Sequence, residues 1–295
     1  MRNYGIPRYS EIDPSWLFAV SFILMFGMMF GDIGHGGLIA LFGWWQRRRL
    51  QSFSAFAMLA GASSMLFGTL YGSVFGYDEL FHPLWMSPLS DPILMLTLAL
   101  YWGIGFIILA TGLTIRNRLS DRRYRAALLA SDGLAGLLFY LALLHLLYRL
   151  GNGEALGLTS TLLVGLPFGV ILVNLWLHTQ APLGERALIV IIEGFETIMR
   201  YVSNTLSFLR VAAFSLNHVA LAIAVFTLAG MLQTTGYWVT VVLGNLFILV
   251  LEGSIVAIQV LRLEYYEGFS RFFSGDGRAF RPLKLGQENS PEIDY

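Results

Sequence analysis

The sequence predicts an all-α integral membrane protein of about eight transmembrane helices, the last two long and strongly tilted. Two observations carry this prediction. The chain is 56% hydrophobic and 13% charged, with a mean hydropathy of +0.65, whereas an average soluble domain is about 45–50% apolar and about 25% charged. Its apolar residues also gather in segments of the length that a helix needs to cross a bilayer, about 20 residues.

We expect a short cytoplasmic lead at residues 1–14, a membrane domain at 15–273 and a cytoplasmic tail at 274–295. The lead lacks the apolar core of a signal peptide. The first apolar segment, Trp16–Trp45, is interrupted by "GDIGHGG", which predicts two short helices that meet at a glycine-rich break. Four single spans are then expected, at Ser52–Gly76, Pro92–Ile115, Ala126–Tyr148 and Leu156–Leu177.

The last two apolar segments, Ala187–Leu232 and Tyr237–Phe273, are longer than a membrane is thick. At 1.5 Å per residue they would measure about 69 and 55 Å, against about 30 Å for the hydrocarbon core. Each must therefore tilt strongly, project from the membrane, or both.

Positive charge is unevenly distributed between the predicted loops. One side receives Arg47–Arg49, the loop Arg116–Arg125 and Arg186, with Arg2 and Arg8 near the start and Arg271, Arg278, Arg281 and Lys284 near the end; the other side receives one arginine, Arg149. Because cytoplasmic loops carry an excess of Lys and Arg, we expect both termini to be cytoplasmic. The chain has no cysteine, which excludes disulfides and thiolate metal sites.

Three glycines follow one another at four-residue spacing in "GTLYGSVFG": Gly68, Gly72 and Gly76. A stripe of small residues lets another helix approach closely. We interpret this stripe as a packing face and assign it no chemistry.

An arginine lies deep in the first long segment, in "SNTLSFLRVAAFSLNH". An ionisable group at this depth costs roughly 2.5 kcal/mol or more on insertion scales and usually marks function. Glu196 precedes Arg210 by about 21 Å of helix rise and lies only about 40° away in azimuth. Asn217 falls about 20° from Arg210, and His218 lies about 12 Å deeper at about 80°.

The final helix runs in the opposite direction and carries Glu252 and Arg262. In an antiparallel pair, Arg210 and Arg262 come to comparable depth, with Glu252 and His218 on the outer side of them. Arginine is always charged and cannot relay a proton, whereas glutamate and histidine can. The set therefore suits two half-channels that do not meet, with a partner carrying the proton between them.

A structural interpretation competes with this one. Arg210 and Arg262 could be ion-paired with Glu196 and Glu252 only to fix helix packing. Glu193 and Arg200, near a helix end, are the kind of charges that reach the interface without further role. Asp32 and His35 in "GDIGHGG" fit either a tight bend or the lining of a cavity.

Four motifs resemble one family along nearly the whole chain. They are "FGMMFGDIGHGGLI", "FGTLYGSVFG", "SNTLSFLRVAAFSLNH" and "LEGSIVAIQVLRLEYYEGFSRFFSGDGRAFRPL". In this order they are similar to the membrane half of subunit a, or subunit I, of V-type and A-type rotary ATPases. The resemblance implies eight helices whose last two pack against a ring of c-type proteolipid subunits.

The resemblance also implies residue roles. Arg210 corresponds to the essential arginine that faces the rotor ring, and Arg262 to a second arginine of that pair. Glu196 occupies the position of the acid on the cytoplasmic half-channel, and His218 and Glu252 match polar positions of the outer one. Asn217, Glu193, Asp32 and His35 are secondary candidates.

Family members carry a soluble stator domain before the membrane half, and only the predicted lead precedes the first span here. A separate stator subunit, an excision from a longer chain, or a membrane module recruited without an ATPase head each fit this difference. We expect as partners a c-type proteolipid ring, a separate peripheral-stalk polypeptide, a V1- or A1-type ATPase head and the lipid bilayer, and no nucleic acid.

The expected function is ion translocation, with the proton as the expected ion, in the plasma membrane of a bacterium or archaeon. No Walker-type glycine loop is present, so we expect this chain not to hydrolyse ATP, and we expect no cofactor and no metal. Two alternatives belong to other classes. One is a self-contained transporter or channel, because broken helices and midplane charges also mark transporters; the other is a scaffold in which the charges are structural.

Overall fold

The computed structural model describes residues 15–77, 82–154 and 157–272. The predicted lead and tail, with Arg2, Arg8, Arg278, Arg281 and Lys284, lie outside the described residues. Within the described residues every regular element is a helix, and the one β feature is an isolated bridge between Val74 and Tyr77. The predicted all-α membrane fold is confirmed.

The helices are α1 (Ser15–Met29), α2 (Ile33–Trp45), α3 (Arg47–Leu50), α4 (Ser52–Tyr71), α5 (Pro92–Ser120), α6 (Tyr124–Leu129), α7 (Leu134–Gly151), α8 (Leu158–His178), α9 (Leu183–Ser207), α10 (Leu209–Gly230), α11 (Thr234–Phe247), α12 (Gly253–Leu263) and α13 (Ser270–Phe272), with π-helical turns η2 (Ile248–Glu252) and η3 (Glu264–Phe269). Six continuous helical segments of the described chain are long and apolar enough to cross a membrane. The α1 and α2 helices are shorter than a full span, so the count of eight stays a prediction.

The structure confirms one predicted boundary and corrects others. The break in the first segment lies at the predicted glycines, between α1 and α2. The α4 helix ends at Tyr71 and not at Gly76, because Gly72 takes the left-handed conformation (φ 79°) that closes a helix. The span predicted at Ala126–Tyr148 is divided into α6 and α7, and α5 continues to Ser120.

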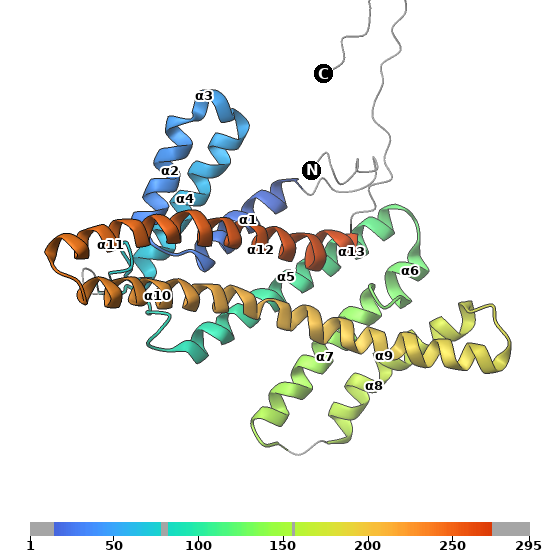
Figure 1. Ribbon diagram of the computed structural model, residues 1–295. Helices are drawn as coiled ribbons and strands as arrows, with labels where there is room; N and C mark the ends of the chain where they lie inside the picture. The colour runs from blue at the N-terminus through green and yellow to red at the C-terminus, as the bar shows by residue number, and fades with distance from the viewer. Residues whose placement is uncertain (1–14, 78–81, 155–156, 273–295) are drawn as a thin grey trace, which may run out of the picture.

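The two long segments run side by side across the molecule. In Figure 1, α9 and α10 form one continuous rod and α11 to α13 form the other, and the α2–α4 and α7–α8 hairpins project to opposite ends. The apolar spans within the rods, Leu183–Gly230 and Thr234–Phe269, contain 48 and 36 residues, which is roughly 72 and 54 Å of rise. The steep crossing against the hairpins agrees with the strong tilt that their length predicts.

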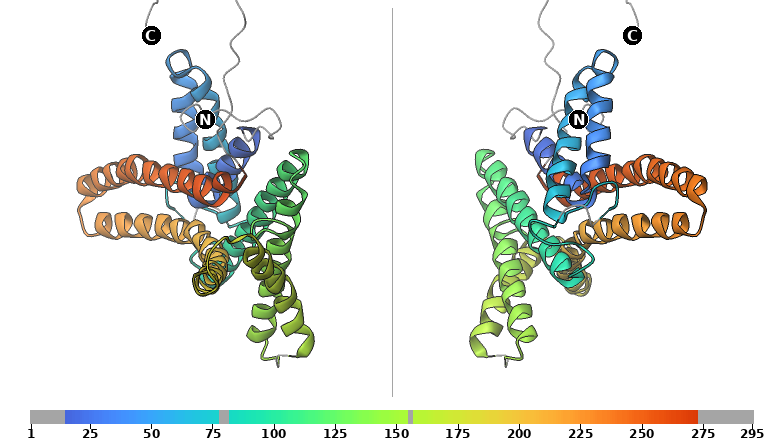
Figure 2. Two further views of the ribbon diagram at one scale, coloured as in Figure 1. Left: turned by 90° about the vertical axis from the view of Figure 1, so that its right-hand side faces the viewer. Right: turned by 90° about the vertical axis from the view of Figure 1, so that its left-hand side faces the viewer.

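Two of the arginine-rich turns lie at the same end of the molecule. The α3 turn and the connection between α5 and α6 both lie at the top in Figure 1, and the tip of the α7–α8 hairpin lies at the bottom. Figure 2 shows the same separation from two other sides. The fold thus segregates these positive charges from the opposite tip, as the membrane orientation rule requires.

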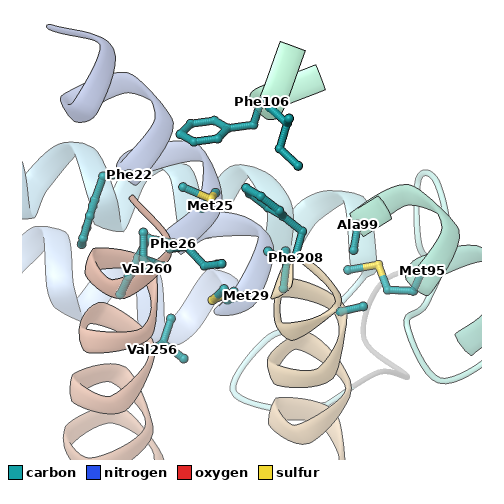
Figure 3. Packing of buried hydrophobic residues seen from close by; sticks show 14 of the residues in the cluster. Phe22, Met25, Phe26, Met29, Met95, Ala99, Phe106, Phe208, Val256 and Val260 are labelled. Atoms are coloured by element: carbon teal, nitrogen blue, oxygen red, sulfur yellow. The ribbon is translucent and has the colours of Figure 1, made fainter. Parts of the chain in front are cut away.

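The core joins the N-terminal helices to the middle of both rods. Figure 3 shows side chains of α1, α5 and α12 converging with Phe208, which lies between α9 and α10. Phe208 is fully buried, and a Cβ on Gly103 of α5 would collide with it. This packing holds the first rod in place two residues before Arg210.

The glycine stripe does not form one packing face. Only Gly68 still lies within α4, where a Cβ would come within 2.6 Å of the backbone of Asp32 and closer to that of Ile33. Gly72 ends the helix, and Gly76 sits in the following turn with φ 76°. The close approach at Gly68 brings the start of α2 against α4.

Candidate functional site

A buried polar pair lies nearer than the arginines to the turn that connects the two rods. His218 of α10 and Glu252 of η2 are each 2% exposed, and Nδ1 of His218 is 2.8 Å from Oε2 of Glu252. The side chain of Asn217 donates to Oε1 of the same carboxylate at 3.3 Å. The two rods are therefore joined at this level by hydrogen bonds as well as by apolar contacts.

Asp32 connects the break between α1 and α2 to the turn after α4. One carboxylate oxygen accepts the backbone N–H groups of His35 (2.8 Å) and Phe75 (3.0 Å), and the other accepts the Ser73 hydroxyl (2.8 Å) and the Gly76 N–H (2.9 Å). Asp32 is thus the N-cap of α2 and the anchor of a second loop. The tight bend is one correct interpretation of "GDIGHGG".

The same motif also faces the polar pair of the rods. Oδ2 of Asp32 lies 3.9 Å from Nε2 of His218, and Nδ1 of His35 lies 3.0 Å from Oδ1 of Asp32. Both His35 and Asp32 are fully buried, and the His35 and His218 rings are 5.4 Å apart in an edge-on arrangement. Sequence spacing gave no signal for this meeting, because it depends on the packing of the first helices against α10.

Both π-helical turns hold buried acids. Glu252 ends η2, and Glu264 and Glu267 lie in η3. The buried positions of this rod include Ile248, Glu252, Val256 and Val260, and then the stretch from Leu263 onward. Residues four apart in an α-helix, with 3.6 residues per turn, do not stay on one face but shift gradually around the helix. A π turn holds more residues per turn and so brings the buried positions back to one face.

Arg210 and Arg262 lie on the outward side of the rods. Arg262 is exposed and Arg210 is half-buried, with its Nη1 atom buried and without a hydrogen-bond partner. Arg210 is close enough to Arg262 and Glu267 for their charges to act on it. The two arginines therefore lie in the same region of the paired rods, and their comparable depth in the membrane stays a prediction.

An exposed stripe carries the predicted residues of the first rod. Its members recur at alternating spacings of three and four: Glu196, Met199, Ser203, Leu206, Arg210, Ala213, Asn217 and Ala220, all exposed except the half-buried Arg210. Arg210 thus shares a face with Glu196 and Asn217, as their spacing predicts. Glu193 is also exposed on α9.

The ion pairs that the structural interpretation of the arginines assumes do not form. Glu252 bonds to His218 and Asn217, and the charged group near Glu196 is Arg200, at 3.9 Å. No ion pair joins Arg210 or Arg262 to either of these glutamates, all four of which are described residues. The charges of the arginines are left available on an open face.

Two buried acids of the last rod were missed. Glu264 is 2% exposed, and its Oε1 has no hydrogen-bond partner in the described part of the chain. Glu267 is 8% exposed and accepts from the side-chain amide of Asn204 at 3.1 Å in the orientation that satisfies that amide. The motif "RLEYYEG" contains both, and the π turn that directs them inward has no sequence signature.

The arrangement separates titratable groups by position. Glu252 and His218 lie beside Asp32 at one level of the rods. Glu267 lies at another level, near the arginines. Carboxyl and imidazole groups exchange protons at ordinary pH, and arginine does not. Along the second rod, Arg262 lies between Glu252 and Glu267, so a permanently charged group separates the two titratable sets.

Comparison with known proteins agrees with the motifs. The sequence profile of the V-type ATPase 116kDa subunit family matches residues 1–86 and 177–285, more than half of the chain. The first of these segments contains Asp32 and His35, and the second contains both rods.

Curated relatives are archaeal proteins named A-type ATP synthase subunit I. The chain is 29% identical to the one from Aeropyrum pernix, over 96% of this chain and 49% of that protein. It is 28% identical to the one from Halobacterium salinarum, over 94% and 48%. A shorter match to the Saccharolobus solfataricus protein is 38% identical over 36% of this chain and 17% of that protein.

The curated relatives that match nearly the whole chain are about twice as long, so the chain spans about half of their length. The profile match covers most of the described helices that carry the polar groups of the site. From this match, the chain belongs to the V-type ATPase 116kDa subunit family.

Proposed function

We propose that this chain is the ion-translocating membrane subunit of a V/A-type rotary ATPase. In this proposal, Glu252 and His218 belong to an outer half-channel and Glu196 to an inner one, with Arg210 between them. The ion is a proton, and its carrier across the gap is a carboxylate on a neighbouring ring of proteolipid subunits. The observation that carries the proposal is the half-buried Arg210, which forms no ion pair with Glu196 or Glu252 and lies on an exposed stripe between two separated sets of titratable groups.

The physical role of Arg210 follows from its charge. A permanent positive charge favours the ionised form of a carboxylate that comes close to it. A ring carboxylate that reaches Arg210 therefore releases its proton, and it takes up another after it has moved away. The same charge opposes direct passage of a proton between the two half-channels.

Glu267 is a second inner acid in this proposal. Glu196 is exposed on α9 and has Arg200 as its charged neighbour. Glu267 is instead buried and its charge reaches Arg210. We therefore assign the inner half-channel to both acids, with Glu267 nearer the point of transfer.

The proposal implies partners that this chain does not contain. They are the proteolipid ring, a peripheral stalk and an ATPase head; the archaeal relatives are named as subunits of an A-type ATP synthase. The membrane domain at 15–273, the cytoplasmic termini and the location in the cell membrane of a bacterium or archaeon form part of the same proposal.

The test is the replacement Arg210→Gln in the complete complex, reconstituted into vesicles. We expect ATP-driven acidification to fall at least about tenfold, a loss of about 1.4 kcal/mol, with the complex still assembled. Arg186→Gln is the matched control, because Arg186 lies in the same rod and stacks on Trp176 at 4.8 Å, away from the polar groups.

Two results would contradict the proposal. One is normal acidification by the Arg210→Gln complex. The other is ion flux through the purified chain in vesicles without any ring, which would favour the self-contained transporter.

A further inference from the structure

Asp32, His35 and His218 form a compact buried cluster of metal-ligand types. Each offers one ligand atom, and these atoms all lie within 4.8 Å of one another. The three side chains are 0%, 0% and 2% exposed. They come from the start of α2 and from α10, which are far apart in sequence and held together by the core.

The orientation of His218 suits a metal ligand. Its Nδ1 is 2.8 Å from the Glu252 carboxylate, and its Nε2 is buried, has no hydrogen-bond partner and lies 3.9 Å from Asp32. A metal-binding histidine nearly always donates its other ring N–H to a carboxylate or carbonyl group, which fixes the tautomer. Glu252 supplies that second contact here.

His35 provides an imidazole whose Nδ1 lies 3.0 Å from Oδ1 of Asp32, another member of the cluster. Both of its ring nitrogens are buried, and within the described residues neither makes a hydrogen bond of good geometry. A buried polar group left unsatisfied costs about 1–3 kcal/mol. A cation bound through a ring nitrogen would satisfy that nitrogen and remove the cost.

Asp32 is held in place by its loop contacts. Ligand carboxylates of metal sites are themselves hydrogen-bonded in this way. Its Oδ2 faces His218 and accepts the hydroxyl of Ser73. A hydroxyl rotates freely, so Ser73 can turn away and leave a lone pair on that oxygen.

The spacing is near that of a four-coordinate site. Zn–N and Zn–O bonds of about 2.0–2.2 Å place neighbouring ligand atoms roughly 3–3.5 Å apart in a tetrahedron. Oδ1 of Asp32 lies 3.0 Å from Nδ1 of His35, Oδ2 lies 3.9 Å from Nε2 of His218, and one ligand atom from each residue falls within 4.8 Å of the other two. Closure of about 1.5 Å in the longest separation reaches the tetrahedral spacing.

We propose that Asp32, His35 and His218 form a binding site for one divalent transition-metal ion of the Zn²⁺ class, with a fourth position open to water. Two imidazoles and one carboxylate are ligands that Zn²⁺ accepts in proteins. The consequence for transport rests on the proposed function: the bound ion occupies Nε2 of His218, and the outer half-channel is closed to protons while the ion stays.

Binding is tested first, without reference to transport. The complete complex, purified with a tag that contains no histidine, is stripped with a chelator and titrated with Zn²⁺, and bound zinc is measured by elemental analysis. We expect one equivalent in the wild type that His35→Gln loses and His145→Gln retains. His145 is an exposed histidine of α7, outside the cluster, and serves as the control.

A second binding measurement needs no variant. X-ray absorption of the wild-type complex with one equivalent of Zn²⁺ should show a four-coordinate ion with two histidine ligands. A coordination shell of oxygen alone, or equal zinc content in the wild type and His35→Gln, would overturn the proposal.

Transport is then measured in vesicles with Zn²⁺ present on the outer face or removed by chelator. We expect reversible inhibition of ATP-driven acidification, with at least a tenfold higher half-inhibiting concentration in His35→Gln, each variant being compared with its own zinc-free rate. Any inhibition of ATP hydrolysis by Zn²⁺ in the head acts equally on the wild type and on His35→Gln, so it does not contribute to the difference between them. Stoichiometric binding without inhibition would confirm the site and contradict its link to the outer half-channel.

Discussion

Glu252 and Asp32 are two buried carboxylates with different surroundings. Asp32 accepts four hydrogen bonds, three of them from backbone N–H groups, which fill the lone-pair positions that a carboxylate has. Glu252 contacts one imidazole and one side-chain amide. Asp32 therefore holds the fold together, and Glu252 keeps the freedom that a proton relay needs.

Amide replacements separate these two roles. Asp32→Asn presents an NH₂ group to donors, so we expect a loss of roughly 1–3 kcal/mol of stability and a lower unfolding temperature of the purified chain. Glu252→Gln keeps a partner for His218 and should leave that temperature nearly unchanged. It should lower ATP-driven acidification at least about tenfold, because an amide does not titrate.

The reverse pattern would contradict this assignment. A stable Asp32→Asn protein with lost transport, next to a destabilised Glu252→Gln protein with normal transport, would exchange the two roles.

Individual residues were predictable where one helix determines their relation. The spacing of Glu196, Arg210 and Asn217 predicts one face, and all three lie on one outward stripe. The meeting of His218 with Asp32 was not predictable, because it joins segments separated by most of the chain. Glu267 was missed because its inward direction depends on a π turn.

The contact between α4 and the start of α2 positions Asp32 and His35 beside His218. Gly68 has no side chain, and this lets the α2 N-terminus lie directly on α4. Asp32 can then reach the turn at residues 73–76. The glycine pattern in the sequence correctly indicates close packing, and its continuation past Tyr71 does not, because Gly72 ends the helix.

We expect Gly68→Ala to destabilise the protein, because the added Cβ meets backbone atoms that cannot move aside. Overpacking of this kind typically costs about 1–3 kcal/mol, measured as a lower unfolding temperature in detergent. Gly37→Ala is the control, since a Cβ at Gly37 in α2 meets no atom within 4 Å. Equal stability of the two variants would show that the approach at Gly68 is not tight.

At the scale of the whole molecule, the two rods leave one side open. The stripe from Glu196 to Ala220 includes Ser203, Ala213 and Ala220 beside Arg210. Small residues at such positions let a second helix approach the backbone closely in a membrane. On the other rod, Ser254, Ile258 and Arg262 are likewise exposed.

The overall architecture was largely predictable, because composition and segment length determine the membrane class and the tilt of the rods. The way the two hairpins project from the rods was not, since it depends on contacts between distant parts of the chain, such as those of α4 with α1 and of α8 with α9. The exposed arginine face fits our proposal that a ring of proteolipid helices covers it.

Site-specific photocross-linking from position 206 tests that claim most directly. Leu206 lies one turn before Arg210 and is 52% exposed, and Leu163 of α8, also 52% exposed, provides a control position. In native membranes, a photoreactive residue at 206 should give a covalent product with a small proteolipid, and one at 163 should not. Products at 206 that contain only lipid, or a second copy of this chain, would contradict the account.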